Sequence, residues 1–514
     1  MIPHHYFLSA AIVVLATLWS TASLAMPTFA RQYKTGCTTC HTAYPRLNPV
    51  GEAFRLNGYK FTDDEVLRKE EQIDLGDEVY KKLWPEALWP NRLSMTSPLS
   101  FITTWVAEWD TNPGRDAYTG EEEAHVKFLM PHEIETAWAG SLDDHLSAYG
   151  DLRFVQEDFS SDETYSWLMI KGWLQFEDLI GPENLINLQV GSVGMHTLGL
   201  FNAREEQKMG FLNYLLNGWS MPGLLLNLDG LTYVQGTILK DFEGNTFVLQ
   251  PQTGLEINGF GRKWLYYLGV VNGNITNPLY SPPEDSVFFL GSGANTDSKD
   301  VYGGLVYKFG GIGFDGSGAG DLTRRTAPTD FWRDDSLLFS LFGYSGRGRI
   351  TTLLWDVDPG ISINPHTVGA HTFHIEYDDF WRLGAGFTGN YKDFSLNLGY
   401  MLGRNKNPYG YLDTMYGGGQ GDAAVDSTTW FAETYYFVYP WLIPFLRYES
   451  LKLEGLPDYL ILEGERDRDI LKLGCRAQIR ANISLRIEGS TYLKDQGYDY
   501  GLDHTIFFIL NASF

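Results

Sequence analysis

Apolar and polar residues alternate with a period of two over much of the chain from about residue 99 onward. One clear run places Leu471, Leu473, Cys475, Ala477 and Ile479 on one face and Lys472, Gly474, Arg476, Gln478 and Arg480 on the other. Because successive side chains of a strand point to opposite faces, this pattern predicts strands. One face of each strand needs an apolar medium, and the other needs water or charge partners.

About 16 to 18 such runs follow one another, separated in rough alternation by short turns and long loops, as in outer-membrane barrels. The long loops, rich in Gly, Asp, Asn and Pro, include 276–300, 311–335, 405–427 and 454–469. Outer-membrane barrels carry short periplasmic turns and long external loops. We therefore predict an all-β transmembrane barrel of about 16 antiparallel strands, within a range of 14–18.

The C-terminal stretch "HTIFFILNASF" supports this fold class. Ile506, Phe508, Leu510 and Ala512 share a face with the last residue, Phe514, and a final strand ending in an aromatic residue resembles the assembly signal of bacterial outer-membrane proteins. A soluble β-sandwich or propeller would also alternate, but no repeat of blade length is found. The terminal Phe and the basic residues inside good strands favour the barrel.

Residues 1–25 have the pattern of an export signal. "FLSAAIVVLATLW" is an apolar core of suitable length, and "SLA" before Met26 is a small-residue cleavage site. The apolar run is short for a transmembrane helix, and no later stretch reaches the ~18 apolar residues that a spanning helix needs. Export to the bacterial outer membrane is therefore expected. The net charge of −25 gives no basic footprint for nucleic acid.

A compact segment, about residues 26–98, precedes the barrel at 99–514 and is expected to form a small helical domain. Asn48 and Pro49 are a favourable N-cap and first helical residue, and Gly58 is a plausible stop. A second helix is expected over 75–83, before Pro85.

This segment contains Cys37-Thr38-Thr39-Cys40-His41, the spacing of covalent c-type haem attachment. The two thiols form thioethers with the porphyrin vinyl groups, and His41 then lies where its imidazole can ligate the iron. A zinc site would need further Cys or His ligands nearby. A dithiol redox motif would be expected in a βαβ setting. The motif therefore predicts one haem c.

The sixth iron ligand stays open between several candidates. These are Met95, the α-amine of Met26 after signal cleavage, His125 or His132 at the barrel entrance, and water. Four basic residues around the motif are candidate partners of the haem propionates, namely Arg31, Lys34, Arg46 and Arg55.

The stretch "MPTFARQYKTGCTTCHTAYPRLNPVGEAFRLNGYKF" resembles the fused outer-membrane cytochrome–porins of iron-oxidising bacteria and of bacteria that exchange electrons with extracellular acceptors. The resemblance implies a monohaem cytochrome c fused to a barrel, with Cys37 and Cys40 as attachment sites and His41 as axial ligand. It implies electron transfer across the outer membrane between an extracellular donor or acceptor, such as ferrous iron, and a soluble periplasmic cytochrome. Acidic external loops would gather metal cations near the mouth.

Two other functions fit the same residues. The first is a diffusion porin whose haem domain is a plug or sensor. In that function Lys472, Arg476 and Arg480 would line a path for anions. A small-molecule haem enzyme or gas sensor would need an open sixth coordination site. Whether the N-terminal segment closes the lumen distinguishes the conduit from the open porin.

Overall fold

A computed structural model describes the parts of the chain on which the following account rests. These are residues 28–33, 35, 39–43, 46–61, 72–74, 92–94, 99–110, 126–142, 145–157, 165–193, 252–272, 299–319, 333–355, 371–407, 424–455, 467–480, 483–493 and 505–513. The expected signal at 1–25, the expected helix at 75–83 and Phe514 lie outside these residues.

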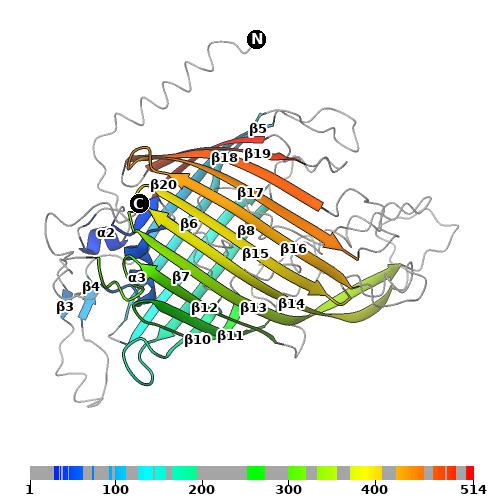
Figure 1. Ribbon diagram of the computed structural model, residues 1–514, viewed down its shortest axis with the longest axis horizontal. Coiled ribbons are helices and arrows are strands. Elements are labelled where there is room, and N and C mark those ends of the chain that lie inside the picture. Colours follow the sequence, from blue (N-terminus) through cyan, green and yellow to red (C-terminus); the bar gives the residue numbers. More distant parts are fainter. Residues whose placement is uncertain are drawn as a thin grey trace, which may run out of the picture.

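Sixteen antiparallel strands close into a barrel, as predicted (Figure 1). Each strand pairs with its neighbours in sequence, and β20 pairs with β5 to complete the ring. The strands are β5 (Leu99–Asp110), β6 (Val126–Ser141), β7 (Leu146–Glu157), β8 (Tyr165–Phe176), β9 (Asn187–Val193), β10 (Gln252–Phe260), β11 (Trp264–Val271), β12 (Asp300–Gly310), β13 (Ser336–Trp355), β14 (His371–Tyr391), β15 (Phe394–Asn405), β16 (Val425–Tyr436), β17 (Leu442–Glu454), β18 (Asp467–Arg480), β19 (Ile483–Tyr492) and β20 (Thr505–Ser513).

The distribution of side chains is inverted relative to a soluble protein. Apolar side chains on the outer face are exposed, for example Leu341 at 61% and Leu473 at 62%, whereas Asn397 and Arg447 on the inner face are fully buried. The alternation predicted for 471–480 is confirmed where side chains are described, because Lys472 and Arg476 are buried inside and Leu473 and Ile479 are exposed. A polar interior and an apolar exterior are what a barrel in a bilayer requires.

The connections between strands alternate between the two ends of the barrel, because every strand is antiparallel to its neighbours. Short turns at 142–145, 261–263, 392–393 and 437–441 lie at one end. The expected loops at 405–427 and 454–469 connect strands at the other end.

The prediction that places 311–335 among the external loops is wrong. This segment joins β12 to β13 and therefore lies at the end with the short turns. Its described first part packs against the N-terminal segment, since Ile312 and Ala319 form a buried cluster with Val50. Local composition indicates a long loop but not the end of the barrel at which it lies.

The N-terminal segment lies at the same end (Figure 1). It contains α2 (Thr28–Tyr33), the hairpin of β1 (His41–Ala43) and β2 (Arg46–Leu47), and α3 (Pro49–Leu56), while β3 (Gln72–Asp74) pairs with β4 (Arg92–Ser94) further along the chain. The expected start of the helix is confirmed, because the Asn48 side chain accepts a hydrogen bond from the backbone N–H of Gly51. Neither described helix is long and apolar enough to cross a membrane.

The outer face can be tested with Leu341→Arg on β13. If this face contacts hydrocarbon, the charge should cost about 2–4 kcal/mol of folding free energy in lipid. Urea titration of the protein refolded into phosphatidylcholine vesicles measures this cost. The control Glu454→Arg, at the exposed end of β17, should change it by less than about 0.5 kcal/mol. Equal stability of the two variants would contradict a lipid-facing Leu341.

Candidate functional site

The second half of the Cys-x-x-Cys-His motif is fixed against the start of α3. The backbone carbonyl oxygen of Cys40 accepts a hydrogen bond from the N–H of Asn48 at 2.9 Å, and that of Thr39 accepts one from the Asn48 side-chain amide at 3.0 Å. A Cβ atom on Gly51 would lie 2.0 Å from the Cys40 oxygen, so this approach requires glycine. His41 begins β1 and pairs with Leu47. One asparagine thus both caps the helix and positions the motif.

The structure places only some of the predicted site residues. Cys40 and His41 are described and half-buried. Cys37, Met26, Met95 and His125 lie outside the described residues, so their expected roles stay predictions.

His132 does not lie at the entrance that faces the N-terminal segment. It belongs to β6, and it is displaced toward the long-loop end from Trp138. Trp138 is the cross-strand partner of Leu99, whose carbonyl oxygen accepts the hydroxyl of Thr28. His132 and Trp138 are six strand residues apart, at about 3.3 Å per residue. The expectation that His132 reaches back to the motif is therefore not supported.

The donor chemistry fits a covalently attached haem. Cys40 presents a thiol directly before the imidazole of His41, and both are held on a backbone fixed by the α3 cap. Within the described ranges, no three or more His, Cys, Asp or Glu side chains are grouped to hold a metal ion.

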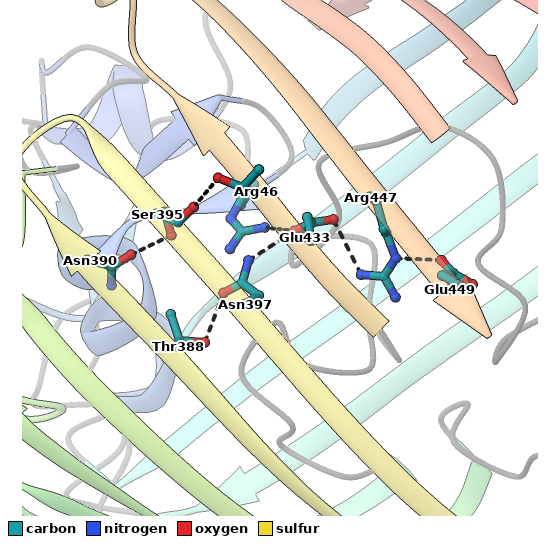
Figure 2. A network of polar contacts seen from close by, with 9 residues as sticks. Arg46, Thr388, Asn390, Ser395, Asn397, Glu433, Arg447 and Glu449 are labelled. Carbon is teal, nitrogen blue, oxygen red and sulfur yellow. Dashed lines mark hydrogen bonds and ion pairs between the residues drawn. The ribbon is translucent and has the colours of Figure 1, made fainter. Parts of the chain in front are cut away.

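The hairpin that carries His41 touches the inner wall of the barrel through Arg46 (Figure 2). The Arg46 guanidinium forms an ion pair with Glu433 of β16 at 3.3 Å and lies 4.7 Å from the ring centre of Tyr435. Glu433 also accepts hydrogen bonds from Arg447 at 3.3 Å and from Asn397 at 3.0 Å. All these groups are buried, so loss of one partner would leave an uncompensated charge in a low-dielectric site.

A second set of polar contacts joins the end of α3 and the residues after it to the end of β8. Lys60 forms an ion pair with Glu177 at 3.0 Å, and the Gln175 amide donates to the carbonyl oxygen of Leu56 at 3.3 Å. Gly58 adopts a left-handed φ of +63°, and a Cβ atom there would lie 1.7 Å from a Glu177 carboxylate oxygen. Only glycine allows the chain to approach the wall at this point.

Apolar and aromatic packing completes the contact. Leu56 belongs to a buried cluster with wall residues Phe260, Leu265, Val306 and Leu338 and with Phe314 of the β12–β13 connection. Phe29, Tyr33, Phe54, Tyr59 and Phe61 pack edge to face or stacked within the segment. Tyr59 then stacks on the wall residue Trp173, with ring centres 5.9 Å apart.

These contacts reach several sides of the barrel. The segment meets β5 through Thr28, β7 and β8 through Tyr59, β10 to β13 through α3, and β16 through Arg46. It therefore lies across the lumen at the short-turn end, rather than beside the barrel.

Two of the expected propionate partners are engaged elsewhere. Arg46 binds Glu433, and Arg55 forms an ion pair with Glu52 within α3. The side chains of Arg31 and Lys34 are not described. Sequence reasoning missed Glu433 and Arg447, although a charged residue at an inward position of a well-formed strand was the available signal.

Comparison with known proteins gives likenesses of low identity. No family model and no curated protein matches the chain. Among solved structures, in-vitro-folded OmpT of Vibrio cholerae is 11% identical, with a TM-score of 0.42, 81% of this chain and 96% of that chain covered. OmpF of Salmonella typhi in complex with daunomycin is 8% identical, with a TM-score of 0.42 and coverage of 81% and 97%. The anion-selective porin from Comamonas acidovorans is 11% identical, with a TM-score of 0.43 and coverage of 81% and 98%.

The class of protein follows from the chain itself. A closed ring of sixteen antiparallel strands, an apolar outer face and a polar lumen define a porin-like outer-membrane barrel in contact with lipid. The described residues 28–61 contact its inner wall at the short-turn end.

Gly58→Ala tests how the segment is held. An alanine in the left-handed region, directed at Glu177, should weaken the seated state by on the order of 2 kcal/mol. Trypsin cleavage near Lys60 in the folded protein, followed by mass spectrometry, should then become at least about tenfold faster. Gly140→Ala is the matched control, since a Cβ atom there meets nothing within 4 Å. Equal cleavage rates in both variants would contradict the seating of Gly58 on the wall.

Proposed function

We propose that this protein is a monohaem electron-transfer protein of the bacterial outer membrane. The observation that carries the proposal is the position of the Cys-x-x-Cys-His motif, whose Cys40 and His41 lead into a hairpin that contacts the lumen wall. A cytochrome segment lying across the lumen suits electron transfer better than free diffusion of solutes.

Each part of the chain has a role in this proposal. A bound haem c supplies a one-electron redox centre. Cys37 and Cys40 would hold it covalently, His41 would be the axial ligand, and α3 would keep the hairpin in place. The barrel wall excludes lipid from the site, and the short-turn end lies where a soluble periplasmic cytochrome can approach.

The apolar band of such a barrel is about 25 Å tall, so one centre near one end cannot lie close to both faces. A periplasmic carrier therefore completes the path on one side. On the other side, the resemblance of the motif region favours an extracellular metal ion such as ferrous iron. The net charge of −25 would favour the local concentration of cations.

A diffusion porin with a haem-bearing plug is the second candidate. The sixteen-stranded barrel with a polar lumen favours it. Lys472 and Arg476 face inward, as a path for anions would require. Both are buried, however, and the Lys472 amine lies 3.8 Å from a Glu449 carboxylate oxygen. The Arg480 side chain is not described.

Liposomes test the proposal directly. The full-length exported protein is reconstituted with an oxidised soluble cytochrome trapped inside, and ferrous iron is added outside. Reduction of the trapped cytochrome is expected with the unaltered protein, and markedly slower reduction is expected with Cys40→Ser, because the haem would then keep only the thioether to Cys37.

A parallel measurement separates the two candidates. Swelling of the same liposomes in small sugars reports diffusion through the lumen. Swelling together with equally fast cytochrome reduction in the unaltered protein and in Cys40→Ser would favour the porin, because a lumen open to small sugars also admits ferrous iron. Cys475→Ser, on the outer face of β18, is the matched control for the thiol and should reduce the cytochrome normally.

A further inference from the structure

Six charged side chains form a row on the outer face of the barrel near its long-loop end. The row consists of Arg347 on β13, Asp379 on β14, Arg404 on β15, Asp426 on β16, and Lys452 and Glu454 on β17. These residues share the face that is apolar nearer the short-turn end, where Leu341 precedes Arg347 by six residues and Leu398 precedes Arg404 by six. We call the six residues the β13–β17 charged row.

The strand register makes this row continuous. Arg347 lies opposite Asp379 on the neighbouring strand, and Arg404 lies opposite Asp426. Trp381, two residues along β14 from Asp379, is the cross-strand partner of Arg404. The two oppositely charged pairs are therefore adjacent, and the β17 members of the row lie next to them because β17 pairs with β16.

The row lies at the height where the hydrocarbon of the membrane should end. Exposed aromatic side chains such as Tyr436 mark the other edge of the apolar band, at the short-turn ends of the strands. Arg404 is ten residues beyond Phe394, the first residue of β15, and Lys452 is ten residues beyond Leu442, the first residue of β17. At about 3.3 Å per residue and a strand tilt of about 35–45°, ten residues rise roughly 23–27 Å. Since the apolar band is about 25 Å tall, these charges lie among the lipid headgroups.

The ion pairs of the row are open to solvent. The side chains of Arg347 and Asp379 are 52% and 50% exposed, and those of Arg404 and Asp426 are 49% and 50% exposed. Exposed pairs of this kind contribute little to stability, because water competes for both charges. Each guanidinium can therefore exchange its carboxylate partner for another anion at low cost.

The row belongs to one sector of the barrel. Trp109 is ten residues beyond Leu99, the first residue of β5, and Met130 is 11 residues before Ser141, the last residue of β6. At these corresponding positions of β5 and β6 the outward side chains are apolar and exposed. Charge at the long-loop edge is therefore a local feature of β13 to β17 and not a property of every strand.

The row also lies at the base of a ribbon that projects beyond the other strands (Figure 1). In the described residues, β12 pairs with β13 only as far as Ser345, and β15 pairs with β14 only as far as Phe380. The two strands continue together to the pair of Trp355 with His371. A two-stranded ribbon is marginally stable in water by itself, so a ligand held at Arg347 would stabilise the ribbon where it leaves the barrel.

We propose that the β13–β17 charged row binds the phosphate groups of the glycolipid in the outer leaflet of the bacterial outer membrane. The three basic side chains bind phosphate oxygens, and the two arginines do so through paired hydrogen bonds. A lipid is the partner because the row is continuous with the apolar wall, against which the acyl chains of the same molecule lie. This inference depends on the barrel and its membrane and is independent of the proposed electron transfer.

Native mass spectrometry of the exported, full-length protein in nonionic detergent tests the inference. The probe is bisphosphorylated lipid A, titrated in the presence of EDTA so that divalent cations cannot link phosphates to carboxylates. Combined substitution Arg347→Gln, Arg404→Gln and Lys452→Gln should weaken binding at least about tenfold, because three charge-assisted contacts are lost. Heat-dependent gel mobility verifies that the variant forms a closed barrel.

Arg333→Gln is the matched control. Arg333 is half-exposed and forms an ion pair with Asp393, but it lies at the short-turn end, so its loss should leave the affinity unchanged. Asp426→Asn tests the row in the opposite direction, since it keeps all three basic groups and removes the carboxylate beside Arg404. This variant should bind the probe about 1.5- to fivefold more tightly, because the guanidinium loses a competing partner.

Three results would overturn the inference. The first is equal affinity of the triple variant and the Arg333→Gln control. The second is equally tight binding of the same glycolipid without its phosphates, because the apolar wall alone would then account for binding. The third is thermal stabilisation by inorganic phosphate that equals the stabilisation by lipid A, which would assign the row to a free anion.

Discussion

Closure of the β-ladder is the constraint on which the rest of the structure depends. A strand in hydrocarbon has no water to satisfy its backbone groups, so every strand must have a partner on both sides. Pairing of β20 with β5 satisfies this requirement for the ring. The outer face can then be apolar, and polar and charged groups collect in the lumen, where they need partners of their own.

The N-terminal segment supplies some of those partners. Glu433 is shared between Arg46 of the segment and Arg447 of the wall, so the interior charges of the barrel and the seating of the segment are energetically linked (Figure 2). Burial of these charges is costly unless each is paired. The barrel and the segment are therefore better understood as one folded unit than as a pore with an independent domain attached.

Much of the fold could be predicted because residue polarity along a barrel strand alternates between the lipid-facing and the lumen-facing side. Alternation over 471–480 correctly predicts which side chains face lipid, and the Asn48-Pro49 pair correctly predicts the start of α3. The site was less predictable, since it depends on residues distant in sequence. Nothing near Arg46 indicates that its partner is Glu433, and composition alone did not reveal that Ile312 and Ala319 pack against Val50. The Cys-x-x-Cys-His motif is recognisable from its spacing, but the contact of its hairpin with Glu433 follows only from the structure.

The central claim is that a covalently attached haem lies inside the mouth of this barrel. A density map of the exported, full-length protein extracted from outer membranes tests it most directly. The account predicts porphyrin density joined to Cys37 and Cys40, within the ring of strands at its short-turn end. An N-terminal segment lying outside the lumen, or cysteines without attached density, would contradict it.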